Sequence, residues 1–516
     1  MSERNRHPVS IREVRKYFVD PRNPASADDL AQLSADSVRA MAQIYATGGR
    51  IEDMDADTQK LLRGDGDDEL QKVVGRVLRR EADTRIFDHR FMGQIHPQGN
   101  QAGILANLIA AYMNTNLIVR EVSQSEHDME IQVVRWMSNM FGYDPEQASG
   151  NITTGGTTAN YAAIMVARKK TIKRMWEQDE KKPRKNQTPL YVLTSRWRHY
   201  SVDKVCDHAG LRLVTIPSRG GEENATPADN FKMSPHMLER GIERIRNAGG
   251  EVAAIVGLAG ETETGIVEDL DVLADIAERH EVFLHVDAAY GGPFVFSREK
   301  GRFKGIGRAD SITTDPHKML YTPYPAGAVL FREKSDHGLL HADTRYLGVV
   351  GARIEGSMGS AGVISTWATI ELLGESGIAS ILNHTLDLAD HAYDRVDDSE
   401  TLRPVFEPEL NTLLVGLKPK VVDRVVRATA GSGEVEDYDH FIETVRDGVD
   451  KRGGGHPYIS CNGHVDFQED GNGDEVRRSA FRYIGMHPHT TIDDVDHLFE
   501  RVEEEVKKQL NELENK

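Results

Sequence analysis

Short apolar segments alternate with helical segments along the middle of the chain, and this alternation constrains the fold more than any other feature. Strand-like runs ending near Thr194, Ile216, Leu258 and Val286 are separated by helix-like stretches such as residues 270–279. Strands that alternate with helices pair into a mostly parallel sheet with helices on both faces. The sequence therefore predicts an α/β fold, and ligands of such folds bind at the carboxyl ends of the strands.

The length of the chain predicts more than one domain. The 516 residues exceed what a single compact core usually holds. Residues 1–115 are polar with helical spacing, which predicts an N-terminal helical segment. Residues 116–380 contain the alternation and predict the large domain. Residues 381–516 mix helices with strands and predict a small C-terminal α+β domain.

Composition narrows the possible partners. A net charge of −19 argues against nucleic-acid binding. With 2 cysteines the chain has neither a disulfide framework nor a cysteine metal cluster, and we predict no metal site. No apolar run reaches bilayer length, and the first residues do not resemble a signal peptide. We therefore expect a cytoplasmic protein with no membrane partner.

Chemically versatile side chains follow several of the predicted strands. His199, Thr262, Asp287 and Lys318 each lie just past a strand end. Burial of a lysine disfavours its ammonium form and frees the amine to attack a carbonyl. Lys318 could instead be an ordinary surface lysine. The carboxylate of Asp287, which ends the apolar run 282–286, favours a reactive lysine over this alternative.

A glycine–threonine turn at 155–158 opens a predicted helix. Backbone N–H groups, two hydroxyls and the helix dipole converge there, which makes an anion site. A simple glycine turn with a threonine N-cap is the alternative. An amine, a carboxylate and an anion site are together what pyridoxal 5'-phosphate requires.

These residues carry a resemblance to a known family. The chain resembles the group II pyridoxal-phosphate-dependent amino-acid decarboxylases, which act on glutamate, aspartate, aromatic amino acids or, in bacteria, tyrosine. The motifs at 285–292, 315–319, 324–327 and 355–357 are most similar to those of the bacterial tyrosine decarboxylases, and the strong part of the resemblance covers roughly residues 90–375. The resemblance implies PLP fold type I, which is aspartate-aminotransferase-like, and a homodimer with its active site at the subunit interface.

The resemblance also implies roles for individual residues. Lys318 would hold the cofactor covalently, Asp287 would pair with the pyridine nitrogen, and His199 would stack on the ring. Asp315 is not assigned to the phosphate, because a carboxylate beside a phosphate is unfavourable unless it is protonated or turned away. The other cofactor-binding residues implied are Gly156, Thr157, Thr158, Thr262, Ala289, His317 and, across the interface, Ser357 or Ser360.

Two further residues remain open. The family carries a mobile catalytic loop between the lysine and residues 355–357, and its tyrosine donates a proton to Cα after CO2 leaves. Tyr346 is the tyrosine of this stretch, so the resemblance implies that role; packing of the loop against the protein is the alternative. His96 lies in the polar loop 91–100, where we expect a structural role.

The implied activity is an L-amino-acid α-decarboxylase that releases CO2 and a primary amine. An acidic substrate needs a fixed cation, usually arginine, for its distal carboxylate, and Arg90 lies near the appropriate loop. An aromatic substrate needs an apolar slot. Motif similarity favours tyrosine or another aromatic amino acid over glutamate or aspartate. Another fold type I lyase, or a cofactor-binding protein without turnover, are the remaining alternatives.

Overall fold

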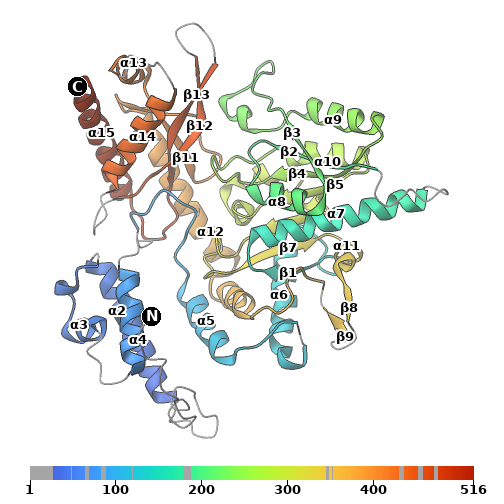
Figure 1. The fold of residues 1–516 in the computed structure, drawn as a ribbon, viewed down its shortest axis with the longest axis horizontal. Coiled ribbons are helices and arrows are strands. Elements are labelled where there is room, and N and C mark those ends of the chain that lie inside the picture. Colours follow the sequence, from blue (N-terminus) through green and yellow to red (C-terminus); the bar gives the residue numbers. More distant parts are fainter. Residues whose placement is uncertain are drawn as a thin grey trace, which may run out of the picture. The chain divides into compact units, whose positions relative to one another are not determined.

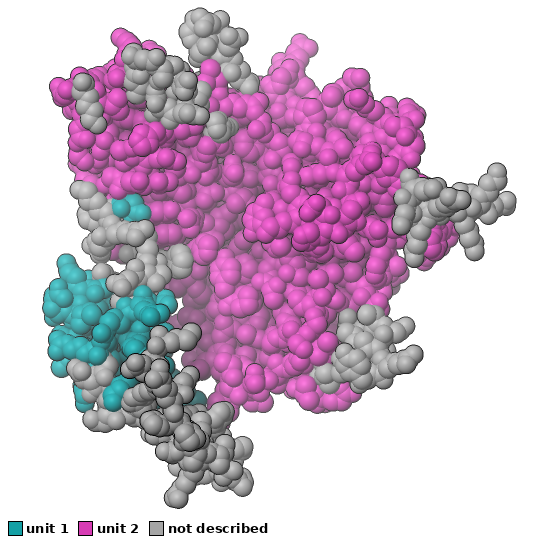
Figure 2. Space-filling view, viewed as in Figure 1, with its two compact units in different colours: residues 1–88, 450–456 teal, residues 89–449, 457–516 magenta. Residues whose placement is uncertain are grey.

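A computed structural model describes residues 27–47, 49–63, 69–82, 89–118, 120–178, 188–344, 348–350, 352–428, 435–450, 457–469 and 475–515. The chain divides into two compact units, residues 1–88 with 450–456 and residues 89–449 with 457–516 (Figure 2). The predicted domain boundaries at residues 115 and 380 stay predictions. The two compact units are defined by contacts within the chain, and their division does not test those boundaries.

Helices account for most of what is described of the smaller unit. A small apolar cluster of Ala40, Ile44, Met54, Leu62 and Leu78 holds them together. Arg79 and Arg80 lie in the last helical turn, where cations suit the helix dipole. The elements are α2 (Asp28–Thr47), the 3-10 helix η3 (Ile51–Asp53), α3 (Ala56–Arg63) and α4 (Glu69–Ala82).

A seven-stranded sheet forms the centre of the larger unit, in the order β1-β7-β6-β5-β4-β2-β3 (Figure 1). Strands β2 to β6 run parallel to one another, and β7 runs antiparallel to both of its neighbours. This mostly parallel mixed sheet confirms the predicted α/β class. The strands are β1 (Ser149–Thr153), β2 (Leu190–Ser195), β3 (Arg212–Ile216), β4 (Glu251–Leu258), β5 (Phe283–Asp287), β6 (Ser311–Thr314) and β7 (Gly327–Phe331).

Helices cover both faces of this sheet, which explains why its strands read as unbroken apolar runs. Val256 of β4 packs with residues of α7 and α8 on one face, and Ile255 packs with residues of α6, α9, α10 and α12 on the other. The helices are α5 (Gln101–Met113), α6 (Gln124–Met140), α7 (Gly156–Gln178), α8 (Tyr200–Ala209), α9 (Pro235–Asn247), α10 (Leu270–Arg279), α11 (Lys334–His337) and α12 (Ala361–Asp397).

A four-stranded antiparallel sheet, in the order β10-β11-β13-β12, forms the smaller C-terminal part that we predicted. Its strands are β10 (Leu402–Pro404), β11 (Thr412–Leu417), β12 (Ser460–Glu469) and β13 (Glu475–Ile484), with helices α13 (Pro419–Ala428), α14 (Val435–Val449) and α15 (Ile492–Glu514).

Several short elements complete the described chain. The strands β8 (Ala342–Thr344) and β9 (Gly348–Val350) pair into a hairpin. Among the described helices, none combines the length and the apolar character needed to cross a bilayer. The short 3-10 helices are Arg120–Val122, Pro227–Phe231, Gly292–Phe296, Arg298–Phe303, Ile306–Arg308 and Gly338–Leu340.

Candidate active site

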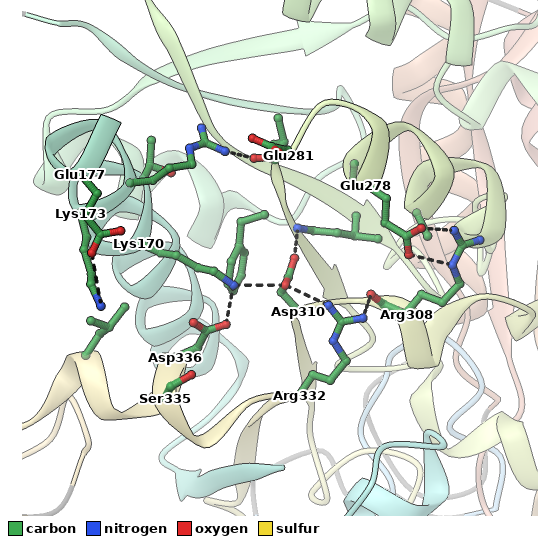
Figure 3. Close-up of a pocket in the computed structure, with 18 residues that line it drawn as sticks. Lys170, Lys173, Glu177, Glu278, Glu281, Arg308, Asp310, Arg332, Ser335 and Asp336 are labelled. Carbon is green, nitrogen blue, oxygen red and sulfur yellow. Dashed lines mark hydrogen bonds and ion pairs between the residues drawn. The ribbon is translucent and has the colours of Figure 1, made fainter. Parts of the chain in front are cut away.

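Two cavities lie at opposite ends of β5 and β6. The one at the amino ends has a volume of about 590 Å³ and is lined by paired charges (Figure 3). The Nζ atom of Lys170 lies 2.7 Å from an oxygen of Asp336 and 3.4 Å from one of Asp310, which also binds Arg332 at 3.2 Å. Burial alone lowers the pKa of Lys170, but Asp310 and Asp336 outweigh it and raise that pKa. None of the predicted site residues lines this cavity.

The cavity at the carboxyl ends has a volume of about 420 Å³ and collects most of the predicted site. The segments after β1, β2, β4, β5 and β6 all contribute to its walls, as expected for a parallel sheet. The predicted residues that line it are Gly156, Thr157, Thr158, His199, Thr262, Asp287, Ala289, His317 and Lys318.

Lys318 lies in a turn directly after β6, where its side chain is 20% exposed. Its Nζ atom lies 3.2 Å from Oδ2 of Asp315, a residue that is only 1% exposed. Burial alone would raise the pKa of Asp315, but the neighbouring Lys318 and His317 lower it. The second carboxylate oxygen, Oδ1, has no hydrogen-bond partner among the described residues, so this end of the cavity has an unsatisfied acceptor.

Asp287 is the last residue of β5 and is 8% exposed. Its Oδ2 accepts a hydrogen bond from Nδ2 of Asn160 at 2.7 Å, and its Oδ1 accepts one from the backbone N–H of Ala289 at 3.2 Å. These two donors fix the direction of the carboxylate at the floor of the cavity. A carboxylate held in this way suits the pyridine nitrogen of the cofactor.

His199 is the N-cap residue of α8, with its ring along the cavity wall. Its Nδ1 atom lies 2.8 Å from Oγ of Ser201 and accepts from the backbone N–H of the same residue at 3.3 Å. Burial lowers the pKa of His199, Asp287 opposes that change and Lys318 adds to it. The imidazole is therefore biased towards its neutral form.

The predicted anion site is formed by the loop before α7 and the first turn of that helix. The hydroxyls of Thr154 and Thr158 lie 2.9 Å apart, and Oε1 of Glu355 accepts from the backbone N–H of Thr154 at 3.0 Å. A Cβ atom at Gly156 would lie 2.8 Å from Oδ2 of Asp315, so glycine is required for this close approach. The loop offers the N–H groups, the hydroxyls and the helix N-terminus that a phosphate needs.

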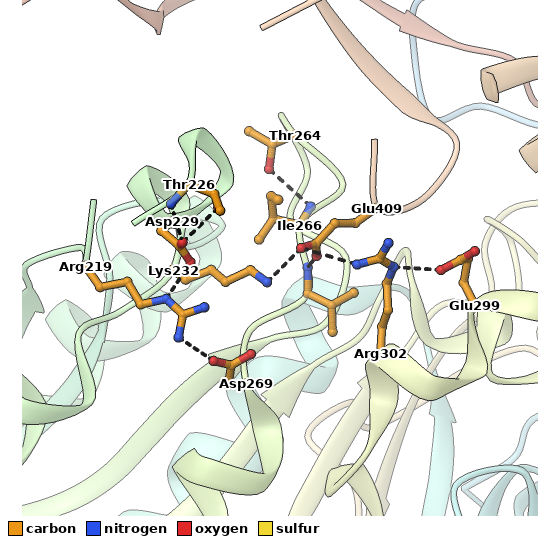
Figure 4. A network of polar contacts seen from close by, with 11 residues as sticks. Arg219, Thr226, Asp229, Lys232, Thr264, Ile266, Asp269, Glu299, Arg302 and Glu409 are labelled. Carbon is orange, nitrogen blue, oxygen red and sulfur yellow. Dashed lines mark hydrogen bonds and ion pairs between the residues drawn. The ribbon is translucent and has the colours of Figure 1, made fainter. Parts of the chain in front are cut away.

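The segment after β4 that includes Thr264 and Ile266 lies beside Glu409, which precedes β11 of the small sheet (Figure 4). One oxygen of Glu409 lies 2.7 Å from Nζ of Lys232, and the other accepts from the backbone N–H of Val267 at 2.8 Å. Arg302 also lies 3.6 Å from the same carboxylate. Glu409 is buried, and these contacts connect the segment after β4 to the chain that precedes β11.

Aromatic side chains that we did not assign from the sequence also line the cavity. The rings of His317 and Tyr324 stack with centroids 3.8 Å apart, and the ring of His96 also stacks on Tyr324, with centroids 5.5 Å apart. Burial lowers the pKa of His96 and raises that of Tyr324 to about 12. We expected a structural role for His96 and did not predict that it lines the cavity. Its position there depends on the tertiary structure. The remaining rings are those of Trp197, Tyr200 and Tyr290.

Two predicted serines of the described chain lie elsewhere. Ser357 is exposed and accepts from Nδ2 of Asn116 at 3.2 Å, while Ser360 is buried and lies 2.7 Å from the hydroxyl of Thr115. Neither serine lines the cavity of its own chain. Tyr346 falls outside the described residues, so its assignment stays a prediction.

The residues that the structure brings together fit pyridoxal 5'-phosphate. An amine, a buried carboxylate and a glycine–threonine cradle face one cavity, as this cofactor requires. Oδ1 of Asp315 is an acceptor in the cavity wall without a partner among the described residues, so it can accept from a further donor.

Comparison with known proteins agrees with this chemistry. The chain is 24% identical over 456 residues to an L-2,4-diaminobutyrate decarboxylase of Acinetobacter baumannii, covering 84% of this chain and 82% of that one. It is 26% identical over 346 residues to an L-tyrosine/L-aspartate decarboxylase of Methanocaldococcus jannaschii, covering 65% and 81%. The fold matches the glutamate decarboxylase domain of a Vibrio parahaemolyticus diaminobutyrate-pyruvate transaminase and L-2,4-diaminobutyrate decarboxylase, with a TM-score of 0.76, 22% identity and coverage of 96% and 99%.

A family model described as the pyridoxal-dependent decarboxylase conserved domain matches residues 76–418. This range includes every residue that lines the carboxyl-end cavity, from His96 to Tyr324. The chain belongs to the pyridoxal-dependent decarboxylase family and is a pyridoxal-phosphate-dependent amino-acid decarboxylase.

Proposed function

We propose that this enzyme acts on tyrosine or another aromatic L-amino acid and releases CO2 and the corresponding amine. The observation that carries this proposal is the ring-rich wall of the cavity, in which His96 and Tyr324 stack within reach of Lys318. Flat aromatic side chains gain free energy from offset stacking against such rings, beyond the burial of area. The residues that line the cavity supply this surface near the reacting groups.

An acidic substrate is disfavoured by the charges of the same cavity. Among the described residues that line it, Lys318 is the one lysine or arginine, and Arg90 does not line it. The distal carboxylate of glutamate or aspartate would therefore find no dedicated cation besides Lys318 among the described residues of the lining. The carboxylate of Asp315 would also repel it, because Lys318 and His317 hold the pKa of that carboxyl below its usual range despite burial.

A basic substrate finds no better partner in the described lining. Glu261 lies in the cavity wall, but its oxygens accept from the backbone N–H groups of Glu263 and Thr264, both at 2.9 Å. The hydroxyl of Thr264 donates to the same carboxylate at 2.8 Å. Because these donors already occupy the carboxylate of Glu261, it has little acceptor capacity left for a cationic substrate.

We assign the residues of the site on the same basis. Bound pyridoxal 5'-phosphate supplies a conjugated ring that accepts the electron pair left when CO2 departs. The amine of Lys318 holds the cofactor, Asp287 keeps a proton on the pyridine nitrogen, and His199 covers the ring. Tyr346 is the proposed proton donor to Cα. The other binding residues in this proposal are Gly156, Thr157, Thr158, Thr262, Ala289 and His317.

We also propose a homodimer in which Ser357 reaches the site of the partner. Large apolar side chains on α5 are 45% to 60% exposed, which is unusual for a free surface in water. Their number on one helix and the exposure of Ser357 support a second copy as the occupant. The residues of this α5 face are Ile104, Leu105, Leu108, Ile109, Tyr112 and Met113.

The substrate proposal is tested by measuring CO2 release from tyrosine, tryptophan, glutamate, aspartate and 2,4-diaminobutyrate. We expect kcat/KM for an aromatic amino acid to exceed the others by at least about tenfold, which corresponds to ~1.4 kcal/mol of stacking and burial. Tyr324→Ala should reduce this ratio by raising KM for the aromatic substrate, while Tyr324→Phe should preserve it. A higher kcat/KM for glutamate or diaminobutyrate would overturn the proposal.

The dimer is tested by light scattering combined with activity. Leu105→Glu with Ile109→Glu places charges on the α5 face, and because both positions are exposed the fold should persist. We expect an inactive monomer. The control is Val272→Glu, which places a charge on an exposed apolar side chain outside the α5 face and should leave the dimer intact. An active monomer would contradict the shared site.

A further inference from the structure

A buried chain of hydrogen bonds connects the two residues proposed to face opposite parts of the cofactor. At its centre is Asn160 of α7, which is 1% exposed and whose Nδ2 atom lies 2.7 Å from Asp287 and 2.9 Å from Oγ of Ser201. Ser201 in turn lies 2.8 Å from Nδ1 of His199. On the other side, Oδ1 of Asn160 lies 3.0 Å from Nε2 of His285.

We propose that Asn160 is a positioning residue that sets the carboxylate of Asp287 and the tautomer of His199 together, and that His285 orients its amide. The inference rests on the proposed roles of Asp287 and His199 in cofactor binding. It does not depend on which amino acid is the substrate.

The direction of each hydrogen bond follows from the carboxylate. Because a carboxylate only accepts, the amide N–H₂ of Asn160 must face Asp287, and its carbonyl oxygen must face His285. His285 therefore donates from Nε2. Burial lowers the pKa of His285 to about 4, although Asp287 opposes that change, so the ring is neutral and its Nδ1 accepts. The hydroxyl of Ser311, 2.9 Å away, is then the donor to Nδ1.

The second amide proton of Asn160 fixes the tautomer of His199. It is donated to Oγ of Ser201, so the hydroxyl of Ser201 is free to donate to Nδ1 of His199. The backbone N–H of Ser201 donates to the same nitrogen at 3.3 Å. A neutral His199 must then carry its proton on Nε2.

Burial makes this arrangement hard to replace. Ser201, His285 and Ser311 are 0% exposed, so water cannot readily substitute for a lost partner. Removal of Asn160 would take one donor from Asp287 and release the hydroxyl of Ser201. That hydroxyl could then accept from an imidazolium, and the pKa of His199 would rise.

The sheet contains a second trio of the same chemistry that serves as a matched control. In β1 and α11, Oγ of Ser149 lies 2.7 Å from Nδ1 of His337, and Nε2 of His337 lies 3.2 Å from Oδ1 of Asn151. Burial lowers the pKa of His337 to about 4, as it does for His285. The amide of Asn151, however, donates to the backbone oxygen of Ile152 at 3.0 Å, and none of the trio lines the cavity.

The test compares Asn160→Ala, Ser201→Ala and Asn151→Ala. The affinity of each apoprotein for pyridoxal 5'-phosphate is titrated by fluorescence, and the acid limb of the kcat/KM–pH profile of each holoenzyme is measured with its best substrate. We expect Asn160→Ala to weaken cofactor binding at least about tenfold and to move the acid limb upward by about half a pH unit or more. Ser201→Ala should move the limb alone, and Asn151→Ala should change neither.

The pKa that the acid limb reports for His199 also depends on the charged groups that face its ring. These are Asp287 on β5, Asp315 and Lys318 after β6, and Lys204 on α8. None of them is altered by the three substitutions.

If Asn160→Ala matches Asn151→Ala in cofactor affinity and pH profile, or if Ser201→Ala leaves the limb in place, the proposal is overturned. Should Asn160→Ala fail to fold, the result for Ser201→Ala decides. Loss of aromatic preference in the wild type would refute the substrate assignment without affecting this outcome.

Discussion

The amino and carboxyl ends of β5 and β6 carry cavities of opposite character. The amino-end cavity is the larger, at about 590 Å³ against about 420 Å³, and its cations are paired with carboxylates. At the carboxyl end, an oxygen of Asp315 in the cavity wall lacks a partner among the described residues. A buried polar atom without a partner calls for an explanation, and in a cavity wall a bound group can supply it. The comparison shows that chemistry, and not size, identifies the site.

The largest expected effect separates the lysines of the two cavities. Lys318→Ala should abolish the visible absorbance of the bound cofactor and reduce turnover on the order of ten-thousandfold or more, because no amine remains to hold the cofactor or move a proton. Lys170→Ala removes a lysine that is paired with Asp310 and Asp336 and should keep both properties. Equal losses in the two variants would remove the distinction between the cavities.

Asp287→Asn should retain the fold and lose most activity. Breaking one partner of a buried charge pair costs about 3–5 kcal/mol. If all of that cost falls on the transition state, turnover drops roughly a hundredfold to a few thousandfold. Steady-state kinetics on the reconstituted enzyme measures this loss. Activity within about threefold of the wild type would rule out the proposed contact with the pyridine nitrogen.

Asp310→Asn should show the reverse pattern at the amino end. Asp310 accepts from the backbone N–H of Leu284 at 2.9 Å and pairs with Arg332 and Lys170. Its replacement should lower the free energy of unfolding by about 2 kcal/mol with kcat unchanged. Urea unfolding and CO2 release on the same preparation provide the two readings. A large loss of kcat without loss of stability would assign this cavity a catalytic role.

A pH-dependent effect on stability is expected from Glu268, a buried acid near the carboxyl end of β4. Burial raises the pKa of Glu268 to about 8, well above its unfolded value. Between these values the folded state holds a proton that the unfolded state has lost, so stability falls as the pH rises towards 8 and is constant above it. The slope for this group is about 1.4 kcal/mol per pH unit. Glu268→Gln should flatten the stability curve between pH 6 and 8 by about that amount, and an unchanged slope would contradict the burial argument.

Much of the fold follows from local sequence patterns. The apolar run at 252–258 forms β4, and the Ser234–Pro235 start predicts α9, whose cap accepts from the N–H of Met237. Burial on both faces makes such strands easy to recognise. The antiparallel direction of β7 could not be predicted, because pairing between distant segments has no local signature.

The site was only partly predictable for the same reason. Lys318 and Asp287 are visible as strand-end residues, which the parallel sheet brings together. Asn160 lies within a helix and His285 within a strand, where both resemble core residues, and their connection depends on the packing of α7 against β5. Tyr324 belongs to a motif recognised from the sequence, but its stacking on His317 is a tertiary contact.

The central claim is that the carboxyl-end cavity around Lys318 holds the cofactor, and borohydride reduction followed by peptide mapping tests it most directly. Reduction makes the bond between the cofactor and its lysine permanent, so the modified residue can be read by mass spectrometry. We predict that the pyridoxyl group is found on Lys318 in the wild type, and also in Lys170→Ala. A pyridoxyl group on Lys170 or on any other lysine of the wild type would contradict the account.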